Sequence, residues 1–193
     1  MARWTVKLEN SITLAGKQAD RKDFLNAFFE SEVYIPKNEA EEREFDEFSL
    51  VMSSMAILIF VALADGTINP LEKQRIIDDL IFQLNQRPLE HKKLAEFGNF
   101  EKDIIGNIYD KIVEDYQTKR CDLDHVVKVI DMVYSNNPEK RQYLVRLSYY
   151  CGYSDGVLKE SEEQAIIKVS EMLKVGNRQR LRIAKEVREE MNL

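Results

Sequence analysis

The chain has 193 residues, of which 44% are hydrophobic and 32% are charged, and its formal net charge is −6 at pH 7. These values are typical of one globular domain with a sizeable core, and the negative charge argues against a general binder of nucleic-acid phosphates. Two cysteines are too few for a disulfide framework or a four-ligand zinc site, and seven glycines and four prolines are few enough to favour an all-α protein.

The apolar segments and the cysteines favour a cytoplasmic protein. Residues 1–7 lack the apolar run of a signal peptide. The strongest apolar run, residues 50–64, is fifteen residues long and contains two serines, which is too short for a bilayer span. It is therefore expected to be a buried core helix. Cys121 and Cys151 are expected to be reduced thiols with a packing role.

Residues 1–38 are predicted to be an N-terminal extension that packs on a domain spanning residues 39–193. The first apolar residues fit both a strand and one face of a helix. A helix is favoured over residues 20–32, where apolar residues form a stripe, and Pro36 ends this segment.

Residues 39–64 are predicted to be helical, because apolar residues recur every three or four positions. Six acids and one arginine among residues 39–47 give a local charge of −5 and suit the positive end of the helix dipole. Gly66 is expected to take the left-handed conformation that ends many helices.

The next helix has three start signals. Asn69 can cap its N-terminus, Pro70 fits the first helical position, and Glu72 completes a capping-box pattern. The expected buried face of this helix consists of Ile76, Ile77, Leu80, Ile81 and Leu84.

The rest of the chain is also predicted to be helical. Residues 85–100 are expected to be a connector with one short helix, and five further apolar stripes lie at residues 104–116, 126–133, 144–151, 166–173 and 181–191. Asp122 is predicted to cap the second of these helices and Asn137 to open the third. The last helix is basic, and its expected buried face carries Leu181, Ala184, Val187 and Met191.

An acidic turn occurs twice, at Asp65-Gly66 and at Asp155-Gly156. From Asp65 to Ile77, six of thirteen positions are identical in the second copy, ninety residues later. This duplication predicts two helical hairpins, joined by a helical connector and packed on one core.

Three interpretations of the turns stay open, and the first is structural. A helical hairpin needs a glycine C-cap and an N-terminal cap, which accounts for Gly66, Asn69, Pro70 and Glu72. It accounts poorly for the aspartates, because a carboxylate at a helix C-terminus faces the negative end of the dipole, unless the free backbone N–H groups of the next helix N-terminus bind it.

The second interpretation is a divalent cation (calcium, magnesium or zinc) held jointly by Asp65, Glu72, Asp155 and Glu162. The spacing matches the latter half of an EF-hand loop, but the earlier ligand positions carry no side-chain oxygen, so neither copy is a complete EF-hand. The third interpretation is a carboxylate-based hydrolase, and no nucleophile or phosphate-binding motif supports it.

Residues 174–188 carry six basic residues and one acid, a local charge of +5. One interpretation of this basic segment is a solvated helix face. The other is a docking surface for a protein partner or for a membrane-associated complex, and it includes Arg178, Arg180 and Arg182.

The paired turns resemble those of the TerB (tellurite resistance protein B) family, which is related to the N-terminal domain of DjlA-type DnaJ-like proteins. The resemblance rests on Ala64-Asp65-Gly66 with Glu72-Lys73-Gln74 and on Ser154-Asp155-Gly156 with Glu162-Glu163-Gln164, each between an apolar helix and an Ile-rich one. It covers roughly residues 45–175.

The resemblance implies an all-α, pseudo-repeated domain without catalytic residues, acting in bacterial stress and tellurite or metal response. It also implies that Asp65, Glu72, Asp155 and Glu162 bind a divalent metal. This chain departs from the pattern at Lys159, which stands where the first turn has Asn69. The expected protein is a cytoplasmic, non-enzymatic adaptor with protein partners, no nucleic-acid partner, and a homodimer as an open alternative.

Overall fold

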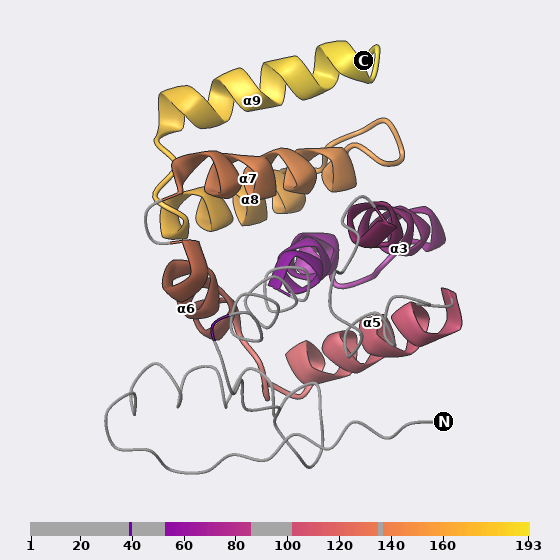
Figure 1. The fold of residues 1–193 in the computed structure, drawn as a ribbon. Helices are drawn as coiled ribbons and strands as arrows, with labels where there is room; N and C mark the ends of the chain where they lie inside the picture. Colours follow the sequence, from indigo (N-terminus) through magenta and orange to yellow (C-terminus); the bar gives the residue numbers. More distant parts are fainter. Residues whose placement is uncertain (1–38, 40–52, 86–101, 135–136) are drawn as a thin grey trace.

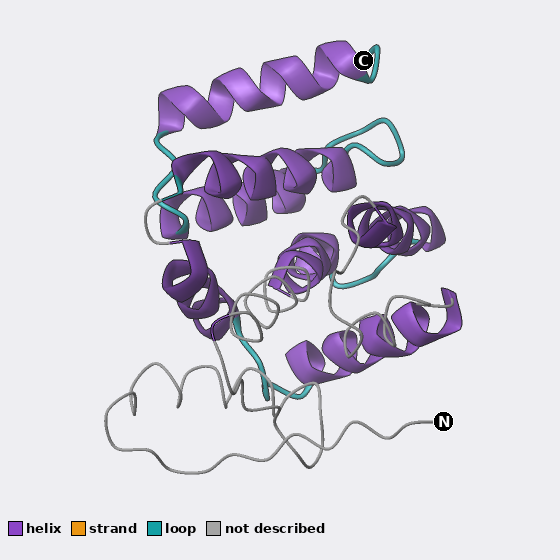
Figure 2. Cartoon of the chain, viewed as in Figure 1, coloured by secondary structure: helices purple, strands orange, loops and turns teal. Residues whose placement is uncertain are grey.

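The computed structural model describes residue 39 and residues 53–85, 102–134 and 137–193. Every regular element in these ranges is helical, as expected for an all-α protein (Figures 1 and 2). The predicted N-terminal extension and the predicted connector at residues 85–100 lie almost wholly outside the described residues.

The elements follow one another closely along the chain. Residues 53–62 are helical and run into a short 3-10 helix, η2 (Leu63–Asp65). The remaining helices are α3 (Pro70–Asn85), α5 (Lys102–Gln117), α6 (Leu123–Tyr134), α7 (Pro138–Gly152), α8 (Glu160–Met172) and α9 (Asn177–Glu190).

The helix at residues 53–62 lies in the centre of the fold. Nearly every one of its side chains from Met55 to Ala62 is buried, as are Ser53 and Ser54 at its start. A helix that is apolar on all sides has to be enclosed by others, which confirms the prediction of a buried core helix. No helix within the described residues is long and apolar enough to cross a membrane.

The other helices cover this centre from two sides (Figure 1). α7 packs against α8 and α9, and α9 is the outermost of the three, whereas α3 packs against α5 and α7. Because η2 contacts α8, the first acidic turn lies beside the helix that follows the second one. The core includes Ile76, Ile112, Ile130, Val145, Ile166 and Val187.

The predicted caps are present. Asp122 Oδ1 accepts the His125 N–H at 2.9 Å, and Asn137 Oδ1 accepts the Lys140 N–H at 3.1 Å, with Pro138 at the first position of α7. Neither cysteine forms a disulfide and both are buried, which confirms their packing role.

The expected buried face of α9 is wrong at one position. Leu181 is 52% exposed, and Ile183 takes its place in the core together with Val187. The helix is rotated relative to the expected stripe because Arg180 points inward, where its guanidinium donates to the Tyr149 hydroxyl at 2.8 Å. The predicted docking set therefore loses Arg180, which is only 8% exposed.

Candidate functional site

The first acidic turn is held together by Asp65. Gly66 has φ 87°, the left-handed conformation predicted for it, and its N–H donates to the Leu63 carbonyl at 2.9 Å. Asp65 Oδ1 accepts the backbone N–H of Thr67 at 3.0 Å and the Thr67 hydroxyl at 3.3 Å. A side-chain carboxylate that accepts the N–H two residues later closes an Asx turn, which mimics a backbone turn.

The second turn repeats this arrangement. Gly156 has φ 89° and donates to the Tyr153 carbonyl at 2.9 Å, while Asp155 Oδ1 accepts the Val157 N–H at 3.0 Å. The Asx turn gives both aspartates the structural role that helix capping alone did not provide. The signal was present in the sequence, since Asp is a preferred residue for capturing the free N–H of a residue two positions on.

The two glutamates lie behind the turns and are almost fully buried. Glu72 and Glu162 are each 1% exposed, and their Oε2 atoms accept the backbone N–H of Asn69 at 2.9 Å and of Lys159 at 2.8 Å. Asn69 Oδ1 also accepts the Leu71 N–H at 2.6 Å, so its predicted role as N-cap is confirmed. The Lys159 side chain has no acceptor atom, so the second turn keeps only the glutamate half of this arrangement.

Lys159 instead joins the two turns. Its Nζ lies 2.6 Å from Asp65 Oδ2, across 94 positions of sequence. This ammonium and the Thr67 N–H hold the pKa of Asp65 below its ordinary value, and Asp65 in turn raises the pKa of Lys159. The sequence shows Lys159 only as a departure from the first turn and carries no signal of this contact.

The surroundings of Glu162 act in the opposite direction. Burial, followed by the neighbouring charges of Glu72 and Asp155, raises the pKa of Glu162 although the Lys159 backbone N–H and ammonium oppose the shift. The contact between Lys159 and Asp65 joins the two turns, and we call their charged residues the paired turns (Asp65, Glu72, Asp155, Lys159, Glu162).

A pH-dependent effect of Glu162→Gln follows. The folded state raises this pKa, so ionised Glu162 lowers stability above its folded pKa, and that penalty disappears as the pH falls below it. Glutamine keeps an acceptor oxygen for the Lys159 N–H. The variant is therefore expected to be more stable than the parent at pH 7, with the difference shrinking towards about pH 4, where free glutamate titrates.

Urea unfolding at pH 7 and pH 4 measures this difference. The exposed neighbour Glu163, changed to Gln, is the control and should show no such pH-dependent gain. A loss of stability at pH 7 in Glu162→Gln would show that its charge stabilises the helix start instead.

The paired turns do not fit a divalent cation as their side chains lie. A hard cation takes six or more oxygen ligands, but Asp65, Glu72 and Glu162 already accept hydrogen bonds, and an ammonium occupies one of the Asp65 oxygens. Among the described residues, no three His, Cys, Asp or Glu side chains are grouped so that they could hold a metal ion. The four-carboxylate cation site stays a prediction.

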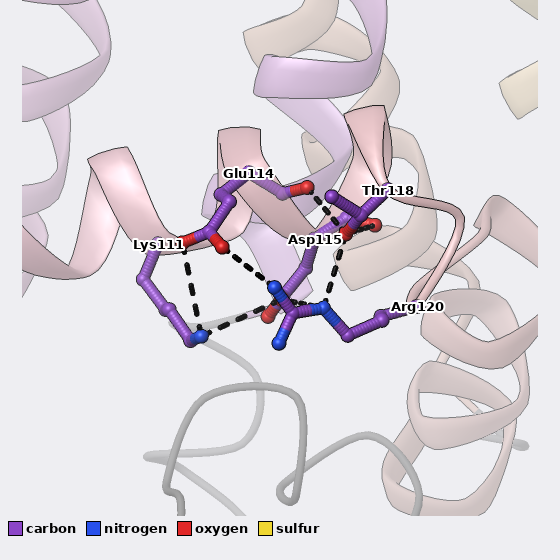
Figure 3. Close-up of polar contacts among 5 residues, drawn as sticks. All are labelled: Lys111, Glu114, Asp115, Thr118 and Arg120. Atoms are coloured by element: carbon purple, nitrogen blue, oxygen red, sulfur yellow. Dashed lines mark hydrogen bonds and ion pairs between the residues drawn. The ribbon is translucent and has the colours of Figure 1, made fainter.

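A second polar cluster lies at the C-terminal end of α5 (Figure 3). The Asp115 side chain is fully buried, with Arg120 Nε at 3.4 Å and Lys111 Nζ at 3.8 Å from its Oδ1. Arg120 also contacts Glu114 at 2.6 Å, and both cations reach towards Asp115 in Figure 3. Burial raises the pKa of Asp115 despite them.

The backbone at Asp115 has a structural role of its own. The backbone carbonyl of Asp115 accepts the N–H groups of Arg120 and Cys121 at 2.8 and 3.2 Å. Lys119, in the turn that precedes Arg120, has φ 58°. These bonds close the end of α5. Sequence reasoning missed Asp115, because an acid between polar residues on an amphipathic helix carries no signal of burial.

Comparison with known proteins identifies the family of this chain. The family model described as "Tellurite resistance protein TerB" matches residues 51–185, a range that contains both acidic turns and most of α9. Searches of the curated proteins and of the solved structures found no significant match.

Proposed function

We propose that this chain, which belongs to the tellurite resistance protein TerB family, is a non-enzymatic helical adaptor in a bacterial tellurite or metal stress response. In this proposal it acts in the cytoplasm and binds a protein partner through the outer face of α9. Its paired turns serve to hold the domain together, because their carboxylates are engaged by backbone N–H groups and by Lys159.

The observation that carries the proposal is the surface of α9, the outermost helix in Figure 1. Five exposed residues of α9 are separated by one or three positions and so lie on one side of the helix: Arg178, Leu181, Arg182, Lys185 and Arg188. We call this set the basic face. The opposite side of α9 carries Ile183 and Val187 and is packed into the core.

The composition of the basic face suits a protein partner with acidic residues around an apolar contact. Leu181 is 52% exposed and lies among the cations. Arg182 lies 3.6 Å from Glu186, and Lys185 lies 3.6 Å from Glu189. Exposed ion pairs of this kind contribute little to stability, so both cations can still bind a partner. Charged groups around an apolar centre are typical of the rim and core of a protein interface.

Reversal of two charges tests this proposal. Arg178→Glu with Arg182→Glu should weaken binding of the partner by about tenfold or more, because complementary charge is replaced by repulsion. The partner is first captured on the immobilised chain, identified and purified, and its affinity for parent and variant is then measured by calorimetry. Growth of a bacterial host on tellurite gives the cellular readout.

The matched control reverses Lys128 and Lys168, which are exposed on α6 and α8 and change the net charge equally. Equal affinity of both double variants for the partner would contradict the basic face as docking surface. Sedimentation with anionic vesicles tests the membrane-associated alternative, and binding of the parent to vesicles without a protein partner would favour it. Turnover of a substrate that is lost in Asp155→Asn would favour the hydrolase alternative.

A further inference from the structure

The ammonium of Lys159 lies where the paired turns accumulate negative charge. Its Nζ contacts Asp65 Oδ2 at 2.6 Å, and the neighbouring charges of Glu162 and Glu72 also raise its pKa. Both glutamate side chains are buried, at 1% exposure. Buried carboxylates at close range need a compensating positive charge, and among the paired turns only Lys159 supplies one.

We infer that Lys159 is the resident cation of the paired turns, so that this chain joins its two hairpins without a divalent metal ion. The ammonium is covalently attached, and it bridges the second turn to Asp65 of the first. A metal ion entering between the same carboxylates would lie next to this ammonium and be repelled by it. The paired turns of this chain therefore differ from the metal-binding turns that the family resemblance implied.

The comparison of the two turns within this chain sharpens the inference. Position 69 of the first turn is asparagine, whose side-chain oxygen caps α3, and the matching position 159 of the second turn is lysine. Lys159→Asn therefore gives the second turn the pattern of the first and removes the positive charge that opposes a metal ion beside Asp65.

Calorimetric titration of the full chain with calcium, magnesium and zinc chlorides tests the inference. The parent is expected to show no saturable binding below about 1 mM, the weak end of protein calcium sites. Lys159→Asn is expected to bind at least one of the three ions about tenfold more tightly than the parent. Asp65→Asn added to Lys159→Asn should remove that gain, which assigns the ion to the paired turns.

A second readout is thermal unfolding with and without the ion. Lys159→Asn should melt at a lower temperature than the parent in the presence of a chelator and should recover when the ion is added. Lys159→Arg keeps the positive charge and serves as the control: it should bind no ion and should melt near the parent. Circular dichroism shows that each variant is folded before titration.

Two results would overturn the inference. One is binding of a divalent ion by the parent that is lost in Asp65→Asn, since the ion would then displace Lys159. The other is a folded Lys159→Asn variant that gains no affinity for any of the three ions. Either result leaves the basic face untouched, because no residue of that face is changed in these experiments.

Discussion

Changing Arg180 to Glu is expected to lower the free energy of unfolding by about 2–4 kcal/mol, because a hydrogen-bonded buried cation becomes an unpaired buried anion. Arg180 is 8% exposed, and its two terminal nitrogens donate to the Tyr149 hydroxyl at 2.8 Å and to Asn177 Oδ1 at 2.7 Å. Tyr149 itself is 1% exposed. The substitution thus removes the donor to a buried hydroxyl on α7 and weakens the attachment of α9.

The matched control for this prediction is Arg178→Glu. Arg178 lies two residues away on the exposed side of the same helix, and its reversal should change stability by no more than about 0.5 kcal/mol. Urea unfolding followed by circular dichroism measures both values. If the two variants lose stability equally, Arg180 does not anchor α9. The comparison also explains why a charge reversal meant to test docking must leave Arg180 in place.

Changing Arg141 to Ala is expected to cost about 2–4 kcal/mol of unfolding free energy, since the buried Leu173 carbonyl and the Asp131 carboxylate both lose this cation as a partner. Arg141 is 6% exposed and joins three helices. Its Nε donates to the carbonyl of Tyr134 at the end of α6 at 3.1 Å, and one terminal nitrogen donates to the carbonyl of Leu173 after α8 at 3.3 Å. The same nitrogen lies 2.7 Å from Asp131 Oδ1.

The position of Arg141 makes its charge effective. The last carbonyls of a helix have no partner within the helix and carry the negative end of the dipole, so one cation between two helix C-termini stabilises both. Lys174→Gln is the matched control, because Lys174 pairs with the same Asp131 at 3.1 Å but its side chain is 70% exposed. It should cost less than about 1 kcal/mol, as exposed pairs do. Similar losses for both variants would contradict the role assigned to burial.

Signals close together in the sequence predicted much of the described fold. The caps at Asn69, Asp122 and Asn137 and the left-handed Gly66 appear as expected, because each depends on hydrogen bonds within about four residues. Whether the two hairpins are a true structural repeat beyond their turns stays a prediction. The turns themselves share the same glycine conformation, Asx bond and buried glutamate.

Sequence patterns were less informative about side chains that act between helices. The charge count grouped Arg180 with its exposed neighbours, although the structure places it against Tyr149 on another helix. The apolar stripe likewise placed Leu181 inside α9, where Ile183 lies instead. A single basic helix has several rotations that satisfy its apolar residues almost equally well. The partner atoms on α7 decide between them.

The sequence by itself determined that the described part of the chain is helical, where α3, α6 and α7 begin, and that an acidic turn occurs twice. These properties depend on periodicity and on capping, which act within one or two helical turns. Only the tertiary structure decided that Lys159 of the second turn reaches Asp65 of the first, at 2.6 Å across 94 residues. That contact requires the two hairpins to pack side by side, and no local pattern specifies which distant charge a flexible lysine will meet.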